Sequence, residues 1–93
     1  MSEVLQILKQ NKATLFKKYP IKTLALFGSY SRGDFKTNSD VDILVDFLQP
    51  VGMEFLDLCY DIEFILKKDV DLVSRGGIKP KYYDFIQEDL QYV

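Results

Sequence analysis

Apolar residues recur at two different periods along the chain, and the change of period divides it into helices and strands. In the N-terminal segment, apolar residues from Val4 to Phe16 recur at helical spacing, and this predicted helix stops before Pro20. Residues 22–27 form a short apolar run, which is typical of a buried strand. From Asp40 onward, apolar and polar residues alternate, which predicts a second strand with two different faces.

The second half of the chain contains a helix, a strand and another helix. Residues 53–68 carry apolar residues on one helical face, residues 69–74 are a strand candidate, and residues 80–90 predict a helix with proline in its first turn. Strands separated by a helix indicate that at least two of them run parallel. The sequence therefore predicts an α/β (α+β) fold, with a small mixed sheet of about three strands packed against about four helices, in one domain over residues 1–93.

The helix predicted over residues 53–68 has more apolar surface than one sheet needs. It carries further large apolar residues off its main face, namely Met53, Leu56, Tyr60 and Phe64. We expect these residues to be buried. Contact with a partner or with a second copy of the chain is the alternative.

Composition restricts the chemistry that the chain can perform. The sequence has no histidine and a single cysteine, Cys59, which excludes an internal disulfide and the usual zinc ligand sets. A net charge of −2 disfavours a protein that wraps nucleic acid. No segment has the apolar run of a signal peptide or of a membrane span. We therefore expect a cytoplasmic protein that binds any metal ion through oxygen ligands.

Two aspartates stand two residues apart on the second predicted strand. Residues at this spacing point to the same side of a strand, so Asp40 and Asp42 face the same space. Two like charges there repel each other unless a cation compensates both. Carboxylate oxygens suit Mg²⁺, which also takes water and nucleotide phosphates as ligands. The pair therefore predicts a magnesium site.

A third aspartate, Asp71, lies on the last predicted strand between Val70 and Leu72. If this strand lies beside the second one, Asp71 faces the same site. It then holds a second metal ion or accepts the proton of an attacking hydroxyl. The alternative for all of these aspartates is an ordinary solvated sheet surface.

The segment before the second strand has the residues of a phosphate-binding turn. Gly28 lets the backbone approach a phosphate, and the Ser29 hydroxyl and the amides of a helical turn over residues 29–32 donate to its oxygens. Arg32 adds a charged fork for the same anion. Asp34 is expected to hold the turn by accepting backbone N–H bonds. With the aspartates, this turn predicts metal-assisted phosphoryl or nucleotidyl transfer.

These residues resemble the signature of a known family. Gly28-Ser29, a gap of ten residues and then the DVD of residues 40–42 are similar to the motif of the minimal nucleotidyltransferases, small relatives of the DNA polymerase beta superfamily. The resemblance implies that the three aspartates form a metal site, with two Mg²⁺ ions, and that the Gly-Ser turn holds ATP as the nucleotide donor.

The resemblance also implies a biological role. Many members of this family are antitoxins that silence a helical HEPN ribonuclease toxin by transferring AMP from ATP to a tyrosine of the toxin. Other nucleotidyltransferases carry an added domain that binds the acceptor. Because this chain is short, we expect its acceptor to be a protein. Two alternatives stay open: an antitoxin that neutralises its toxin by binding alone, and a nucleotidyltransferase that acts on a small molecule or RNA. The sequence is also compatible with a homo-oligomer.

Overall fold

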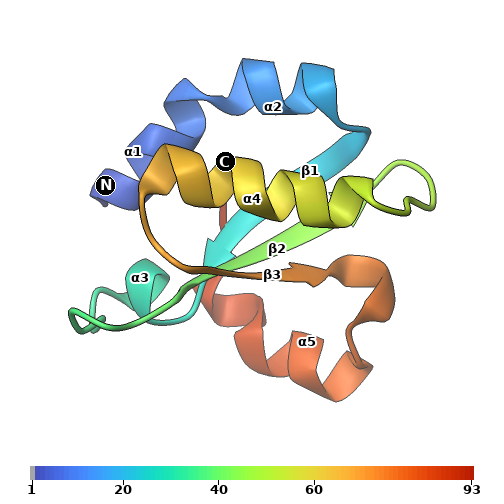
Figure 1. Ribbon diagram of the computed structural model, residues 1–93. Helices are drawn as coiled ribbons and strands as arrows, with labels where there is room; N and C mark the ends of the chain where they lie inside the picture. Colours follow the sequence, from blue (N-terminus) through green and yellow to red (C-terminus); the bar gives the residue numbers. More distant parts are fainter. Residues whose placement is uncertain (1) are drawn as a thin grey trace.

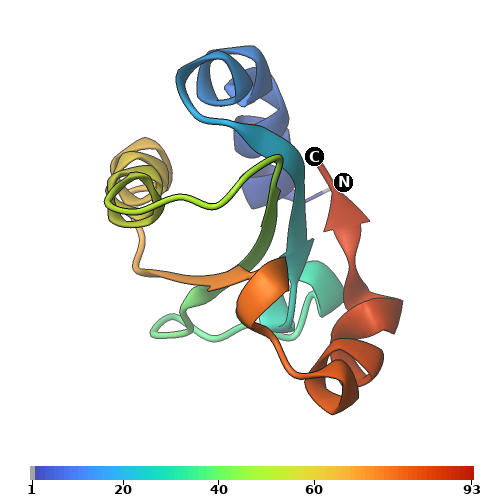
Figure 2. The same ribbon diagram turned by 90° about the vertical axis from the view of Figure 1, so that its right-hand side faces the viewer.

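The computed structural model describes residues 2–93 and contains a mixed sheet with helices on both faces (Figures 1 and 2). The strands of this sheet are β1 (Ile21–Phe27), β2 (Val41–Phe47), β3 (Val70–Ser74) and β4 (Gln91–Tyr92). Their order across the sheet is β3-β2-β1-β4. β2 and β3 run parallel, and β1 is antiparallel to both β2 and β4. The predicted mixed fold is confirmed, with β4 as an additional strand too short to leave a pattern in the sequence.

The helices within residues 2–93 are α1 (Glu3–Gln10), α2 (Lys12–Lys18), α3 (Ser29–Arg32), α4 (Glu54–Leu66) and α5 (Pro80–Ile86). The N-terminal helix predicted as one element is divided, because the Asn11 amide caps α1 by donating to the carbonyls of Ile7 and Leu8. The last predicted helix ends earlier and continues as a 3-10 turn over Gln87–Asp89. In the part of the chain that the structure describes, no helix is long and apolar enough to cross a membrane.

One face of the sheet is covered by α1, α2 and α4, which together enclose the main core. Its central side chains are fully buried, among them Leu8, Leu26, Ile43, Leu58 and Ile62. Full burial of each such side chain contributes about 1.5–3 kcal/mol. Leu58 and Ile62 are four residues apart, so both lie on one side of α4. This side of the helix docks on β2 and β3.

The opposite face of the sheet is covered in part by α5, and Figure 2 shows α4 and α5 on opposite sides of the sheet. A smaller core lies on this side, centred on Phe27, Leu44 and Ile86. Because alternate residues of a strand share a face, Asp42 projects on the same side as Leu44. The α5 side of β2 is therefore apolar in its middle and acidic at its start.

The apolar residues off the main face of α4 are solvent-exposed, so the prediction that they are buried is wrong. The exposed fractions are 66% for Met53, 44% for Leu56, 63% for Tyr60 and 83% for Phe64. The core beneath α4 is already filled by its opposite side. These four residues are left facing water.

Candidate active site

The parallel pairing of β2 and β3 places two of the predicted aspartates side by side. In the register of these strands, Asp42 is the partner of Asp71, and the next pair is Ile43 with Leu72. Paired residues of neighbouring strands project on the same face, and the strands lie about 4.8 Å apart. Both carboxylates therefore project toward the α5 side, while both apolar side chains point into the main core.

The pairing of β2 with β3 also brings together two copies of one tripeptide. The sequence DVD occurs at residues 40–42 and again at residues 69–71, and the two copies lie next to each other. The Val41 amide donates to the Asp69 carbonyl at 2.9 Å, which continues the pairing beyond the ends of the strands. Asp40 precedes β2, which begins at Val41, and is exposed. Asp69 was not among the residues predicted for the site, although the repeat of DVD is a sequence signal that points to it.

The electrostatics of Asp42 reflect this crowding of carboxylates. Burial raises the pKa of Asp42 above its usual value, and the negative charges of Asp71 and Asp40 raise it further, while Arg32 lowers it. Asp42 is half-buried, whereas Asp71 is exposed. A divalent cation would reverse this repulsion, and an all-carboxylate donor set suits Mg²⁺.

The three carboxylates are neighbours without being gathered around one point. Within residues 2–93, no three histidine, cysteine, aspartate or glutamate side chains converge closely enough to hold a metal ion. Side-chain movement is therefore needed before all three carboxylates can hold one cation. The donor chemistry, the common face and the adjacent backbone positions fit a magnesium ion, and the metal-binding role of these residues stays a prediction.

Gly28 follows β1 directly and faces Asp42. Its backbone has φ 73° and ψ −152°, a conformation that L side chains rarely adopt. A Cβ at this position would lie 2.2 Å from Oδ2 of Asp42. Gly28 was predicted to let the backbone approach a phosphate. The structure adds a second reason, because any side chain here would displace the Asp42 carboxylate.

The predicted helical turn after Gly28 is present as α3, which begins at Ser29. The amides of Ser31 and Arg32 both donate to the Gly28 carbonyl at 3.0 Å. α3 therefore starts beside Asp42. The roles of Gly28 and Ser29 in nucleotide binding remain predictions.

Arg32 is held by two carboxylates. Its Nη1 donates to Oδ2 of Asp89 at 2.8 Å, and its Nε donates to Oδ2 of Asp34 at 3.1 Å. The prediction that Asp34 accepts backbone N–H bonds is wrong, since its carboxylate accepts from the Arg32 side chain. Ser31 also donates its hydroxyl to the Asp89 carbonyl, so α3 is joined to the C-terminal 3-10 turn by two contacts. Asp89 could not be predicted as a partner of Arg32, because 57 positions separate the two residues.

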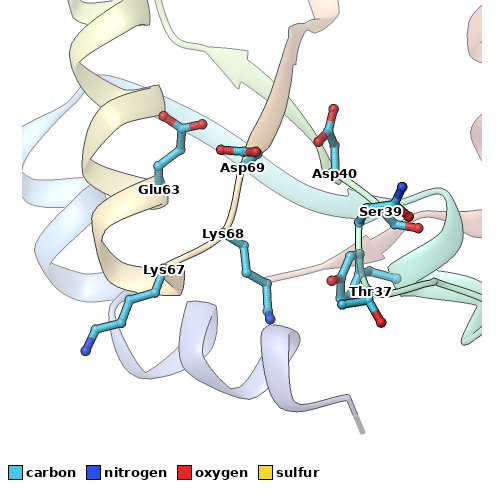
Figure 3. A pocket seen from close by; sticks show the side chains of 9 residues that line it. Thr37, Ser39, Asp40, Glu63, Lys67, Lys68 and Asp69 are labelled. Carbon is cyan, nitrogen blue, oxygen red and sulfur yellow. The ribbon is translucent and has the colours of Figure 1, made fainter.

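A polar cavity of about 480 Å³ lies beside Asp40, between residues 37–40 and the C-terminal end of α4. Figure 3 shows Glu63 and Asp69 on one side of it and Asp40 and Ser39 on the other. Lys68 extends along a further wall. This volume lies within the range of small-ligand sites. Of the three predicted metal ligands, only Asp40 lines this cavity, because Asp42 and Asp71 project toward the α5 side.

Comparison with known proteins shows the family. Residues 1–93 match the family model described as "Nucleotidyltransferase domain". The chain is 42% identical over 97 residues to a Methanocaldococcus jannaschii protein named "Putative protein adenylyltransferase", covering 100% of this chain and 97% of that protein. It is 35% identical over 94 residues to the protein adenylyltransferase MntA of Thermococcus cleftensis, covering 100% and 95%. The chain belongs to the nucleotidyltransferase domain family.

Solved structures share its fold. A structure described as "putative minimal nucleotidyltransferase" superposes with a TM-score of 0.79 and 24% identity, over 98% of this chain and 95% of that chain. A toxin–antitoxin structure with AMP-PNP superposes with a TM-score of 0.76 and 24% identity, over 90% and 70%. These structures show that the fold is shared. The family model and the relatives confirm the predicted nucleotidyltransferase family, and the protein is a nucleotidyltransferase enzyme.

Proposed function

We propose that this nucleotidyltransferase is a Mg²⁺-dependent protein adenylyltransferase that transfers AMP from ATP to a tyrosine of a HEPN-type toxin. The observation that carries the proposal is the register that pairs Asp42 with Asp71 next to Gly28. The names of relatives that match along the whole chain support a protein acceptor. The toxin–antitoxin complexes among its structural neighbours support a toxin as that acceptor.

Each part of the site has its own task in this reaction. Asp40, Asp42 and Asp71 would hold Mg²⁺, in two positions as the family resemblance implies. The bound metal would neutralise the charge that develops on the transferred phosphorus. The turn that begins at Gly28-Ser29 would hold the triphosphate in line with the acceptor, and Arg32 would add a charged donor to it.

The transfer itself is a substitution at the α-phosphorus of ATP. The tyrosine oxygen forms a bond to this phosphorus, the bond to the β-phosphate oxygen breaks, and pyrophosphate leaves. The phenolic proton needs an acceptor. Asp71 is the exposed member of the in-register pair and Asp42 the half-buried one, so Asp71 is the carboxylate that an incoming hydroxyl reaches.

The test is transfer of labelled AMP from ATP to purified HEPN toxin in the presence of Mg²⁺. We expect Asp42→Asn and Asp71→Asn to lower the transfer rate at least about 100-fold, equivalent to ~2.7 kcal/mol of transition-state stabilisation. Asp46→Asn is the matched control, because Asp46 lies on the same face of β2 beyond Leu44, away from Gly28. Its rate should stay close to wild type.

Other outcomes would assign a different function. A toxin that is silenced without gaining AMP would make this chain an inhibitor that acts by binding alone. Label on RNA or on a small molecule in place of the toxin would identify another acceptor. Equal labelling by wild type and Asp42→Asn would rule out the proposed site.

A further inference from the structure

A line of apolar side chains runs along the side of α4 that faces away from the sheet. In Figure 2, α4 is seen nearly end-on at the left of the molecule, with one side toward the strands and the other toward solvent. The exposed residues follow one another at intervals of three or four positions, which places them on one side of the helix. We name them the α4 stripe: Met53, Leu56, Tyr60 and Phe64.

The α4 stripe is larger than the scattered apolar residues of an ordinary surface. Each aromatic side chain can bury roughly 150–250 Å². With two aromatic and two aliphatic members at these exposures, the stripe offers on the order of 400–600 Å² of contact, a size that marks interaction surfaces on single chains.

Three members of the α4 stripe, Leu56, Tyr60 and Phe64, are spaced symmetrically about Tyr60. Leu56 and Phe64 lie equally far from Tyr60 along the helix, in opposite directions. A two-fold axis that passes between two copies of α4, beside Tyr60 and perpendicular to both helices, therefore sets this residue against its own copy and Leu56 of each chain against Phe64 of the other. Such a self-complementary pattern is what an isologous contact between two identical chains requires.

Charges at the two ends of α4 suit the same arrangement. Glu54 is exposed in the first turn, and Lys67 is exposed just after the last turn. Met53 and Lys67 are also equally far from Tyr60, so antiparallel helices bring Lys67 of one chain beside Glu54 of the other. No ion pair found within residues 2–93 involves Lys67.

Two acidic residues near the centre of the contact oppose this arrangement, namely the exposed Asp57, three positions before Tyr60, and Asp61. Asp61 lies next to the symmetry point, where the two copies would approach each other. Its carboxylate is already paired with Lys18 at 2.8 Å and accepts a hydrogen bond from Tyr19 at 2.5 Å. The pair with Lys18 offsets the charge of Asp61 between the copies. The charge of Asp57 is one reason to expect a weak dimer.

We propose that the α4 stripe is the contact of a two-fold symmetric homodimer in which the α4 helices pack antiparallel. The available area lies at the lower end of stable protein interfaces, so the dimer should dissociate in the micromolar range or above. This assembly is independent of the proposed transfer reaction, because neither the stripe nor the test below involves nucleotide.

The first test is sedimentation equilibrium of the purified chain from about 1 to 500 µM, a range chosen for an interface of this size. We expect a monomer–dimer equilibrium, with Phe64→Ser and Tyr60→Ser raising the dissociation constant at least about tenfold. Phe85→Ser is the matched control, since Phe85 is 78% exposed on α5 and lies outside the stripe. Circular dichroism confirms that each variant is folded.

The second test reverses the charges at the ends of α4. Glu54→Lys and Lys67→Glu should each raise the dissociation constant about three- to tenfold, and the double variant should return to within about twofold of wild type. A chain that stays monomeric throughout, stripe variants that dimerise like wild type, or a double variant weaker than both single ones would overturn the proposal. Stripe variants that lose binding only to a HEPN toxin would assign the α4 stripe to that partner and also overturn it.

Discussion

At the scale of single residues, the site depends on how closely Gly28 and Asp42 approach each other. Asp42 occupies the space that a side chain at position 28 would need, and the positive φ of Gly28 lets the chain turn from β1 into α3 at that point. The same carboxylate is crowded by Asp71 and Asp40. The close contact at Gly28 and the crowded carboxylate of Asp42 both lower the stability of the fold while they shape the site. Each leads to a prediction.

Replacing Gly28 by alanine should destabilise the fold and abolish transfer. Strain in a conformation that favours glycine costs roughly 1–3 kcal/mol, and the added Cβ also displaces Asp42. Gly33→Ala is the matched control, because Gly33 has a φ of 89° but no atom within 4 Å of its added Cβ. Urea unfolding should show a loss for both variants. Transfer assays should show a loss of activity for Gly28→Ala alone, and equal activity losses would contradict the role assigned to the Asp42 contact.

Asp42→Asn should leave the metal-free protein as stable as wild type or slightly more stable. Burial and the neighbouring carboxylates raise the pKa of Asp42, so its charge is unfavourable at pH 7 and the amide removes that cost. Thermal unfolding without Mg²⁺ should show a melting temperature that is unchanged or a few degrees higher. Addition of Mg²⁺ and ATP should raise the melting temperature of wild type and not that of the variant. A marked drop for the variant without metal would be the contrary result.

Local spacing made part of this site predictable. The Gly-Ser turn and the DVD of residues 40–42 are close in sequence, and alternation along a strand fixes which side chains share a face. The partner of Arg32 could not be found in this way. Asp89 reaches it through the tertiary packing of the C-terminal turn, and no local pattern encodes that contact.

At the scale of elements, α4 separates a buried side from an exposed side within one helix. The sequence analysis identified the helix, its length and its core face, because that face has helical spacing. It was wrong about the other apolar residues. Hydrophobicity alone does not tell a buried residue from one that faces solvent or another molecule.

Substitutions on the two sides of α4 should therefore differ strongly in their effect on stability. Leu58→Ala and Ile62→Ala should each cost about 2–5 kcal/mol, since both side chains are fully buried. Phe64→Ala should change the free energy of unfolding by less than about 0.5 kcal/mol, because its side chain is 83% exposed. Urea unfolding of the three variants at low protein concentration decides this. A large loss in the free energy of unfolding for Phe64→Ala would show that the Phe64 side chain is buried.

At the scale of the whole molecule, distant parts of the chain are joined by contacts that no local pattern predicts. The sequence indicated parallel strands but not the order β3-β2-β1-β4, because strand order depends on which edges meet during folding. The end of α2 is likewise joined to α4. Asp61 pairs with Lys18 and also accepts a hydrogen bond from the buried Tyr19 hydroxyl.

This link between α2 and α4 should make stability depend on pH. The Lys18 and Tyr19 hydrogen bonds lower the pKa of Asp61 in the folded chain below its unfolded value. The stabilisation is therefore complete above the unfolded pKa, near pH 4, and is lost as the pH falls through the folded pKa. Asp61→Asn should cost about 1 kcal/mol at pH 7, because the carboxylate is still 34% exposed, and much less near pH 2.5.

Urea unfolding of wild type and Asp61→Asn at both pH values measures this difference. Asp57→Asn serves as the control, since Asp57 is an exposed carboxylate of the same helix. A cost for Asp61→Asn that is the same at both pH values would contradict the proposed link.

The pairing of the two DVD tripeptides limits how this protein can change during evolution. A slip of one residue between β2 and β3 would turn Asp71 inward and push Leu72 out of the core, so the core and the proposed active site depend on the same strand register. Point substitutions around the loop between α4 and β3 leave that alignment intact. An inserted or deleted residue within β3 would move Asp71 and Leu72 to the wrong faces of the sheet at the same time. Homologous enzymes should therefore differ in β3 by substitutions and keep the length of the strand.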